Sequence, residues 1–198
     1  PIDVTHSDAA NQALLAAINN FGGLDILISN AGAAHAGPML GISNEELRNA
    51  FELNFFSHYS FSTEAAKILK DQNRGGQILF NISKQAVNPG KNFGAYGLPK
   101  ATTFFLMRQL ALELGSDGIR VNGINADRIR SGLLTDDFIS SRAKSRGVSE
   151  SEYMAGNLLN KEVTAEHVAD AFTALACAES TTGHVMTVDG GNIEASLR

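Results

Sequence analysis

The sequence predicts an α/β domain built on a doubly wound parallel sheet. Short, continuous apolar runs recur along the chain, as is typical of strands that are covered on both faces. Longer segments with helical periodicity separate these runs, and strands that alternate with helices indicate βαβ units with parallel strands. The strand-like runs cover residues 24–29, 77–82, 119–124 and 184–188.

The composition is that of a single cytoplasmic globular domain spanning residues 1–198, with 43% apolar residues. The net charge of −5 and the absence of any Lys/Arg run argue against nucleic acid and membrane partners. The five histidines lack metal-ligand spacing, so we expect no metal. Cys177 is alone between two alanines in a helical pattern, and we expect a buried, unreactive thiol.

Capping signals place several helices. Ser43 and Glu46 form a capping box for a helix that runs to about residue 70. Ser7 or Asp8 is expected to cap the first helix and Thr164 the last. Residues 133–157 are charge-rich and weakly helical, with Gly147 dividing them, so we expect a lid over a substrate there.

The strongest candidate site lies in residues 81–100. Ser83 stands at the carboxyl end of the strand 77–82, and open α/β sheets bind ligands at that end. Tyr96 and Lys100 are four residues apart on a helix expected from 94 to 115, so they share one face. A Tyr/Lys pair alone is common in helices. Ser83 nearby is what favours a catalytic interpretation.

Asn54 is the polar residue in an otherwise apolar stretch of the helix that follows Ser43. A buried Asn must find hydrogen-bond partners, so a structural polar contact is the simpler interpretation. A role in a site is the alternative.

Together these residues resemble the short-chain dehydrogenase/reductase family over the whole chain. The resemblance rests on Asp3-Val4-Thr5, on Ser29-Asn30-Ala31-Gly32 (with Ser replacing the family's first Asn), on the ordered residues described above, and on Val188-Asp189-Gly190-Gly191. It implies a Rossmann-like sheet, NAD or NADP as cofactor, a small-molecule substrate, and a homodimer or homotetramer.

The resemblance also implies a catalytic tetrad of Asn54, Ser83, Tyr96 and Lys100. Tyr96 would be the general acid or base, with its pKa lowered from about 10 by the Lys100 ammonium together with the positive nicotinamide ring. Lys100 would also hold the cofactor ribose. Ser83 would donate to the substrate oxygen, and Asn54 would hold a water in a kinked helix. The implied cofactor-binding residues are Asp3, Val4, Asn30, Ala31, Gly32, Tyr96, Lys100, Ile129 and Ser131.

Two departures from the family pattern carry expectations of their own. The Gly-rich turn that cradles pyrophosphate does not occur, so we expect a domain truncated at the amino terminus, without the first two strands and with residues 25–29 as a bare apolar edge. Ala126-Asp127 replaces the usual Pro-Gly. We expect the arginines that follow, Arg128 and Arg130, to be solvated rather than bound to a substrate carboxylate or phosphate.

A narrower resemblance, in residues 83–89, 125–138 and 188–193, is to the dehydrogenase part of bifunctional proteins that join rhamnulose-1-phosphate aldolase to a short-chain dehydrogenase. It implies lactaldehyde as substrate in rhamnose catabolism, NAD rather than NADP, and fusion to or derivation from an aldolase-containing protein. One alternative is a non-catalytic fragment, or assembly half-domain, that binds no cofactor alone. Another is a tyrosine-dependent epimerase or dehydratase, against which the Val-Asp-Gly-Gly ending argues.

Overall fold

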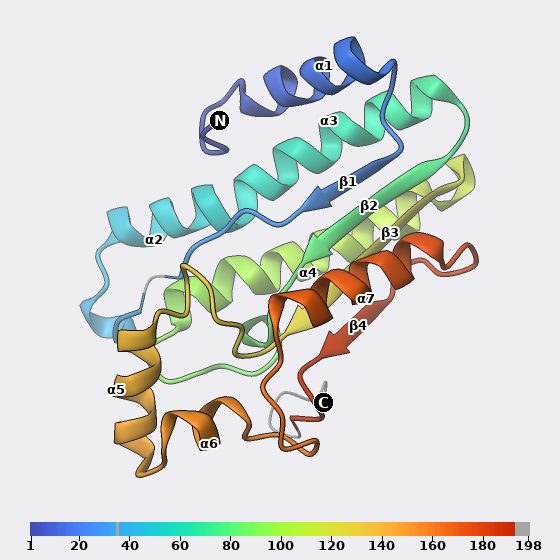
Figure 1. Ribbon diagram of the computed structural model, residues 1–198. Helices are drawn as coiled ribbons and strands as arrows, with labels where there is room; N and C mark the ends of the chain where they lie inside the picture. Colours follow the sequence, from blue (N-terminus) through green and yellow to red (C-terminus); the bar gives the residue numbers. More distant parts are fainter. Residues whose placement is uncertain (35, 193–198) are drawn as a thin grey trace.

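The computed structural model describes residues 1–34 and 36–192. Within these residues the strands form one parallel sheet in the order β1-β2-β3-β4, and their arrowheads point the same way in Figure 1. The strands are β1 (Ile26–Ser29), β2 (Gly76–Asn81), β3 (Ile119–Ala126) and β4 (Val185–Val188). The predicted parallel α/β sheet is confirmed, and β3 runs two residues further than the apolar pattern indicates.

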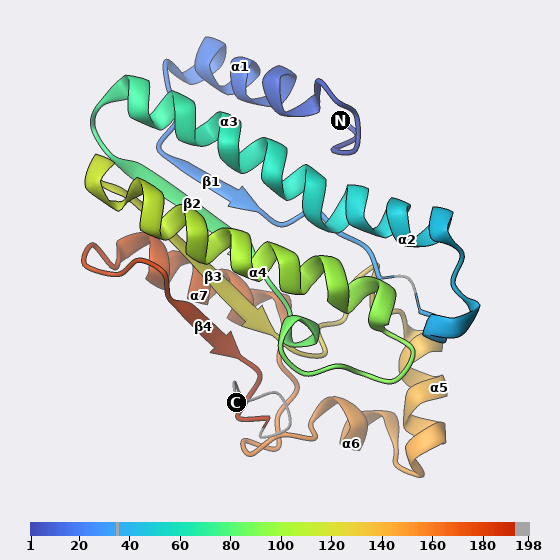
Figure 2. The ribbon, with the colours of Figure 1, turned by 180° about the vertical axis from the view of Figure 1, so that it is seen from behind.

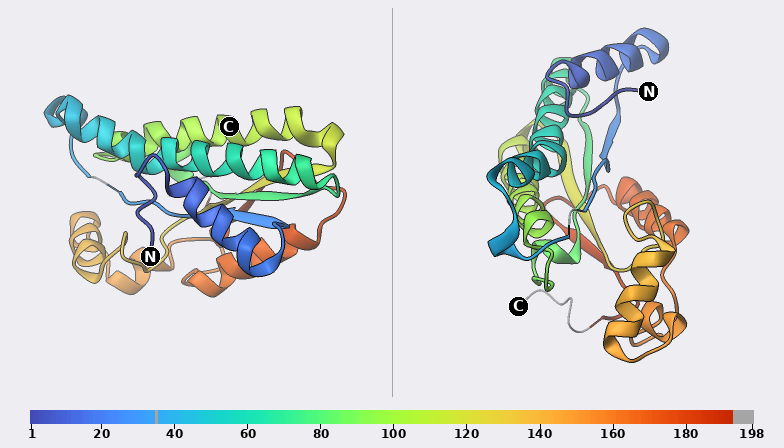
Figure 3. Two further views of the ribbon diagram at one scale, coloured as in Figure 1. Left: turned by 90° about the horizontal axis from the view of Figure 1, so that it is seen from above. Right: turned by 90° about the vertical axis from the view of Figure 1, so that its left-hand side faces the viewer.

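Helices lie on both faces of the sheet, which makes it doubly wound (Figures 1 and 2). On one face lie α2 (Asn44–Phe51), α3 (Ser57–Gln72) and α4 (Gly94–Leu114), and on the other lies α7 (Ala165–Cys177). Figure 3 shows these layers edge-on. The first helix, α1 (Ala9–Phe21), packs beside α3. Beyond the carboxyl ends of the strands lie α5 (Asp136–Arg146) and α6 (Glu150–Met154), separated by Gly147 as expected.

The caps account for where the helices begin. The Ser43 Oγ accepts from the Glu46 N–H at 3.1 Å and the Glu46 carboxylate accepts from the Ser43 N–H at 2.8 Å, so the predicted capping box is confirmed. Thr164 caps α7 with His167 in the position usually held by Glu or Gln. Asp8 is the N-cap residue of α1 but makes no side-chain cap bond.

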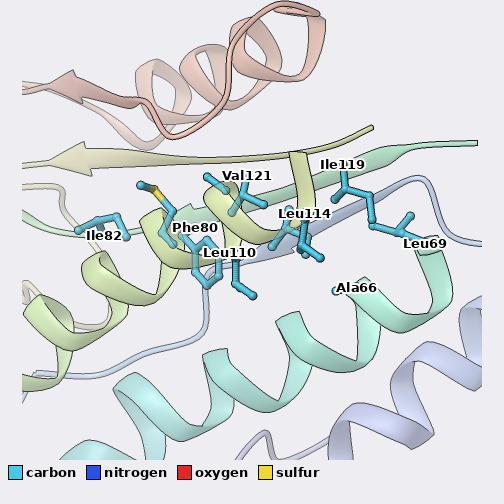
Figure 4. Close-up of a cluster of buried hydrophobic side chains, with 11 residues drawn as sticks. Ala66, Leu69, Phe80, Ile82, Leu110, Leu114, Ile119 and Val121 are labelled. Carbon is cyan, nitrogen blue, oxygen red and sulfur yellow. The ribbon is translucent and has the colours of Figure 1, made fainter. Parts of the chain in front are cut away.

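The main core lies between the sheet and the pair α3 and α4 (Figure 4). Ile78 and Phe80 point to this face of β2, while Leu79 between them points to the other face, where it packs against α7. Each fully buried side chain of this size stabilises the fold by about 1.5–3 kcal/mol. The continuous apolar run at residues 78–80 follows from this cover on both faces of β2.

β1 and Cys177 are both exposed. β1 forms one edge, and its Ile26 and Ile28 side chains are 40% and 51% exposed, as expected for an apolar edge strand. Cys177 is exposed at the last turn of α7, so the prediction of a buried thiol is wrong. Leu175 and Ala176, just before Cys177, pack against the core cluster between the sheet and α7.

Candidate active site

Asn54 lies in a π-helical segment, Glu52–Phe56, that joins α2 to α3. Its side chain is buried, and its Nδ2 donates to the carbonyls of Ala33 at 2.9 Å and Ala50 at 3.1 Å. Its Oδ1 accepts from the Ala33 N–H at 3.3 Å. The expected irregularity of the helix at Asn54 is confirmed, since a π-turn inserts one residue into the α-helical repeat. Asn54 therefore fastens the chain after β1 to this helix.

Ser83 and Tyr96 meet beyond the end of β2. Ser83 begins the 3-10 turn Lys84–Ala86, and Tyr96 is buried in the first turns of α4. Burial raises the pKa of Tyr96, and a hydrogen bond with the Ser83 side chain opposes that rise. The family resemblance implies a lowered pKa for Tyr96. In the chain without its cofactor this pKa is raised instead, because burial is the largest influence on the phenol.

Lys100 is 2% exposed and its Nζ donates to the Asn81 carbonyl at 2.9 Å. Burial lowers the pKa of Lys100 to about 8. The ammonium also lies 5.9 Å from the centroid of the Tyr96 ring and 3.4 Å from the His58 Nε2. An ammonium has three N–H donors. One remains for a ligand after the Asn81 and His58 contacts.

His58 is a member of this cluster that sequence reasoning missed. Its Nδ1 lies 2.6 Å from the Ser29 Oγ, at the carboxyl end of β1. Burial, with the charge of Lys100, lowers the pKa of His58 to about 3, so the imidazole is neutral at pH 7. The signal in the sequence was its position four residues after Asn54, in the same helical stretch.

Two clefts meet at Tyr96. One of about 700 Å³, here the β1–α7 cleft, runs from Ile28 and Gly32 to Phe172. The other, of about 500 Å³ and here the α5 cleft, runs from Ser83 to the α5 side chains. Both are lined by Asn81, Tyr96, Ala126, Ile129, Ser131 and Leu133.

Some of the expected cofactor-binding residues line the β1–α7 cleft and others do not. The β1–α7 cleft is lined by Asn30, Gly32, Tyr96, Lys100, Ile129 and Ser131. Asp3, Val4 and Ala31 line neither cleft, and the Asp3 carboxylate accepts from the Thr5 N–H at 3.0 Å in the exposed segment before α1.

The residues of the β1–α7 cleft fit a nicotinamide nucleotide. A Cβ on Gly32 would lie 2.8 Å from the Asn54 Oδ1 and 3.6 Å from the Lys100 Nζ, so the glycine brings the backbone directly to the site. Lys100, Asn30 and Ser131 supply polar groups to a cleft whose other walls are largely apolar. That combination suits ribose hydroxyls and a carboxamide on an aromatic ring.

Of the two arginines after β3, Arg128 is not solvated as expected, whereas Arg130 is exposed as expected, with its side chain 42% accessible. Arg128 lies 3.4 Å from the Asp127 carboxylate, donates to the Tyr153 carbonyl at 2.6 Å, and has a side chain only 10% exposed. Arg130 pairs with Asp136 and Glu162, each at 2.7 Å. The Tyr153 carbonyl that holds Arg128 and the Glu162 carboxylate that pairs with Arg130 lie far along the sequence, so the Ala126-Asp127 motif does not reveal them.

Among the residues that the structure describes, no group of three or more His, Cys, Asp or Glu side chains is placed to hold a metal ion. No helix in the same residues is long and apolar enough to cross a membrane.

Comparison with known proteins gives the family. Residues 1–192 match the family model described as enoyl-(acyl carrier protein) reductase. The 7alpha-hydroxysteroid dehydrogenase of Escherichia coli (strain K12) is 30% identical over 97% of this chain and 72% of its own. A short-chain type dehydrogenase/reductase from Mycobacterium ulcerans has a structure that superimposes with a TM-score of 0.85 at 29% identity, covering 98% of this chain and 69% of that one. The chain belongs to the short-chain dehydrogenase/reductase family.

Family membership confirms the broader resemblance and favours an oxidoreductase over the non-catalytic interpretation. The uncharacterized oxidoreductase YuxG of Bacillus subtilis (strain 168) is 35% identical over 96% of this chain but only 29% of its own length. The chain therefore spans less than a third of that relative. These comparisons name neither an aldolase nor lactaldehyde.

Proposed function

We propose that this short-chain dehydrogenase/reductase transfers hydride between NAD or NADP and a small alcohol, aldehyde or carbonyl substrate. The observation that carries the proposal is the junction of the two clefts at Tyr96. Ser83 stands on the α5 side of that junction and Lys100 on the β1–α7 side. Such a junction suits a reaction in which one bound molecule meets another.

In this proposal Tyr96 moves the proton. Its phenol gives a proton to the carbonyl oxygen during reduction, or takes the hydroxyl proton during oxidation. The Ser83 Oγ, which already hydrogen-bonds Tyr96, donates to the same oxygen and stabilises its developing charge. The nicotinamide, when bound, supplies or accepts the hydride. Burial, which raises the pKa of Tyr96, favours the protonated acid that reduction requires.

Lys100 and Asn54 have supporting roles. Lys100, held by the Asn81 carbonyl and His58, binds the cofactor ribose with its remaining donor. Asn54 keeps the Gly32–Ala33 backbone against the site through its bonds to Ala33. The proposed cofactor contacts are those of the family resemblance, including Asp3 and Val4 on the adenine side and Ala31 in the turn after β1. Residues 133–157 are the proposed lid.

Lactaldehyde is the specific substrate that the narrower sequence resemblance indicates, with NAD as cofactor and an aldolase as a covalent neighbour. Self-association into a dimer or tetramer is supported by large apolar side chains exposed on α3 and α4. These are Tyr59, Leu98, Phe105 and Leu112, which are 46–79% exposed.

The test is a steady-state assay at 340 nm with each of NAD and NADP against a panel of small alcohols and aldehydes that includes lactaldehyde. Enhanced fluorescence of the reduced cofactor measures binding separately from turnover. Cofactor binding with turnover of at least one panel member is expected. A folded chain that binds neither cofactor would contradict the proposal.

A further inference from the structure

The α5 cleft is strongly cationic in a chain whose net charge is −5. Its walls carry five cationic side chains and one carboxylate, that of Asp127. The cations are Lys84, Lys91, Arg128, Arg142 and Arg146. Asp127 already contacts Lys84 at 2.9 Å and Arg128 at 3.4 Å, so the carboxylate is matched by these two. The remaining cations face the cleft with no wall carboxylate to neutralise them.

Arg142 is the best placed of the remaining cations. Its guanidinium lies against two aromatic rings, with its Cζ 5.8 Å from the Phe93 centroid and 6.0 Å from the Phe138 centroid. The two rings meet edge-on at 5.7 Å. Stacking of this kind holds a guanidinium in one place and leaves its N–H edge available.

The hydrogen-bonding state of Arg142 points to a missing acceptor. Its Nε is buried and has no hydrogen-bond partner among the described residues. Arg142 is in none of the ion pairs found in that part of the chain. A buried N–H on a charged group without a partner is destabilising. A bound anion in the α5 cleft would offset that cost through its charge, by contact with the guanidinium nitrogens that are not buried.

The local sequence explains why Arg142 faces the cleft. Ile139 and Ala143 are buried against α6, so they fix which face of α5 is inward. Phe138, Arg142 and Arg146 follow one another at four-residue spacing on the adjacent face, and all three line the α5 cleft. Arg142, at the centre of that stripe, therefore stands on a helix that is packed against α6.

We propose that the substrate carries an anionic group, a carboxylate or a phosphate monoester, that Arg142 binds while the reacting hydroxyl or carbonyl faces Ser83 and Tyr96. This inference rests on the proposed function and names the substrate class of the same site. A planar guanidinium matches both anions through paired N–H donors. Lactaldehyde is neutral, so the two substrate candidates differ in charge and one assay separates them.

The test compares substrates that differ only at the anionic group. One pair is 2-hydroxybutyrate and butane-1,2-diol, and the other is glycerol 1-phosphate and glycerol. Lactaldehyde is measured beside them. The wild-type protein is expected to prefer the anionic member of one pair in kcat/KM. The pair that shows this preference distinguishes a carboxylate from a phosphate.

The variants are Arg142→Gln, Arg142→Lys and Arg108→Gln. Arg108 is the matched control, because its Cζ stacks on Phe104 at 5.9 Å on α4 and it does not line the α5 cleft. Arg142→Gln is expected to lower kcat/KM for the anionic substrate roughly 10- to 100-fold, the range for hydrogen bonds to charged groups. Its effect on the neutral partner is expected to be small, with Arg142→Lys intermediate and Arg108→Gln unchanged.

Equal use of charged and neutral partners by the wild-type protein, or an equal loss for both in Arg142→Gln, would overturn the inference and leave the proposed function standing. Absence of turnover for every substrate would instead contradict the proposed function. In that case calorimetric titration with 2-hydroxybutyrate and glycerol 1-phosphate still decides the inference. Binding that weakens in Arg142→Gln supports it, whereas binding unaffected by the substitution, or no binding, overturns it.

Discussion

The His58 Nε2 lies 3.4 Å from the Lys100 Nζ, and both side chains are at most 2% exposed. With Lys100 charged, the imidazole must accept at Nε2 and donate from Nδ1 to the Ser29 Oγ, 2.6 Å away. The contact therefore joins the end of β1 to the cation of the site through α3. The Lys100 ammonium can donate to the His58 Nε2 only while the imidazole is neutral.

Stability is expected to fall in acid because of His58. Its pKa drops from 6.5 to about 3 on folding, so the unfolded chain binds more protons between these values. The contribution is fully present above pH 6.5 and is lost as the pH falls toward 3. From pH 7.5 to pH 5 the free energy of unfolding is expected to fall by about 2 kcal/mol through this group. Urea denaturation at the two pH values measures it.

The matched variants are His58→Gln and His184→Gln, since His184 is exposed. His58→Gln should show a shallower decline between pH 7.5 and 5 than the wild-type protein, and His184→Gln should follow the wild type. An unchanged decline in His58→Gln would show that other groups cause it.

Asn54→Ala is expected to destabilise the protein by about 2–4 kcal/mol, because three hydrogen bonds, one buried and two part-buried, are lost and the Ala33 backbone loses both partners on Asn54. Asn49→Ala, at an exposed position of α2, should change stability by less than about 0.5 kcal/mol. Chemical denaturation of both variants is the measurement. Similar effects in the two would mean that Asn54 does not fasten the segment after β1.

Gly32→Ala is expected to weaken cofactor binding, since its new Cβ would stand 2.8 Å from the Asn54 Oδ1 and force that amide or the backbone to move. Gly115→Ala is the control, because a Cβ there meets nothing within 4 Å. Titration with reduced cofactor should give at least about a tenfold weaker Kd for Gly32→Ala, equivalent to about 1.4 kcal/mol. Equal Kd values for the two variants would mean that a Cβ at residue 32 does not disturb the cofactor site.

The sequence is sufficient for the sheet and for the site's framework because those depend on local patterns. The apolar run before Ser83 predicts β2, the spacing of Tyr96 and Lys100 predicts a shared face of α4, and the capping box at Ser43 predicts the start of α2. The irregular helix at Asn54 was also expected, although from the family resemblance rather than from periodicity.

The remaining parts of the site depend on contacts between distant segments. His58 reaches Ser29 and Lys100 only after β1, α3 and α4 pack together. Arg128 is held by the Tyr153 carbonyl, 25 residues later in the chain. The phenol of Tyr96 is buried deeply enough that burial, rather than its charged neighbour, dominates its pKa. No single-sequence pattern measures burial of this kind.

The most direct test of the proposed role of Tyr96 is kcat for Tyr96→Phe beside Tyr59→Phe, whose tyrosine is 47% exposed on α3. Loss of a general acid or base typically costs about 10²- to 10⁴-fold in rate. Tyr96→Phe is predicted to lose activity within that range while its cofactor Kd and its unfolding midpoint stay close to wild type, and Tyr59→Phe is predicted to keep full activity. Wild-type kcat in a folded Tyr96→Phe variant would contradict the role of this phenol in proton transfer.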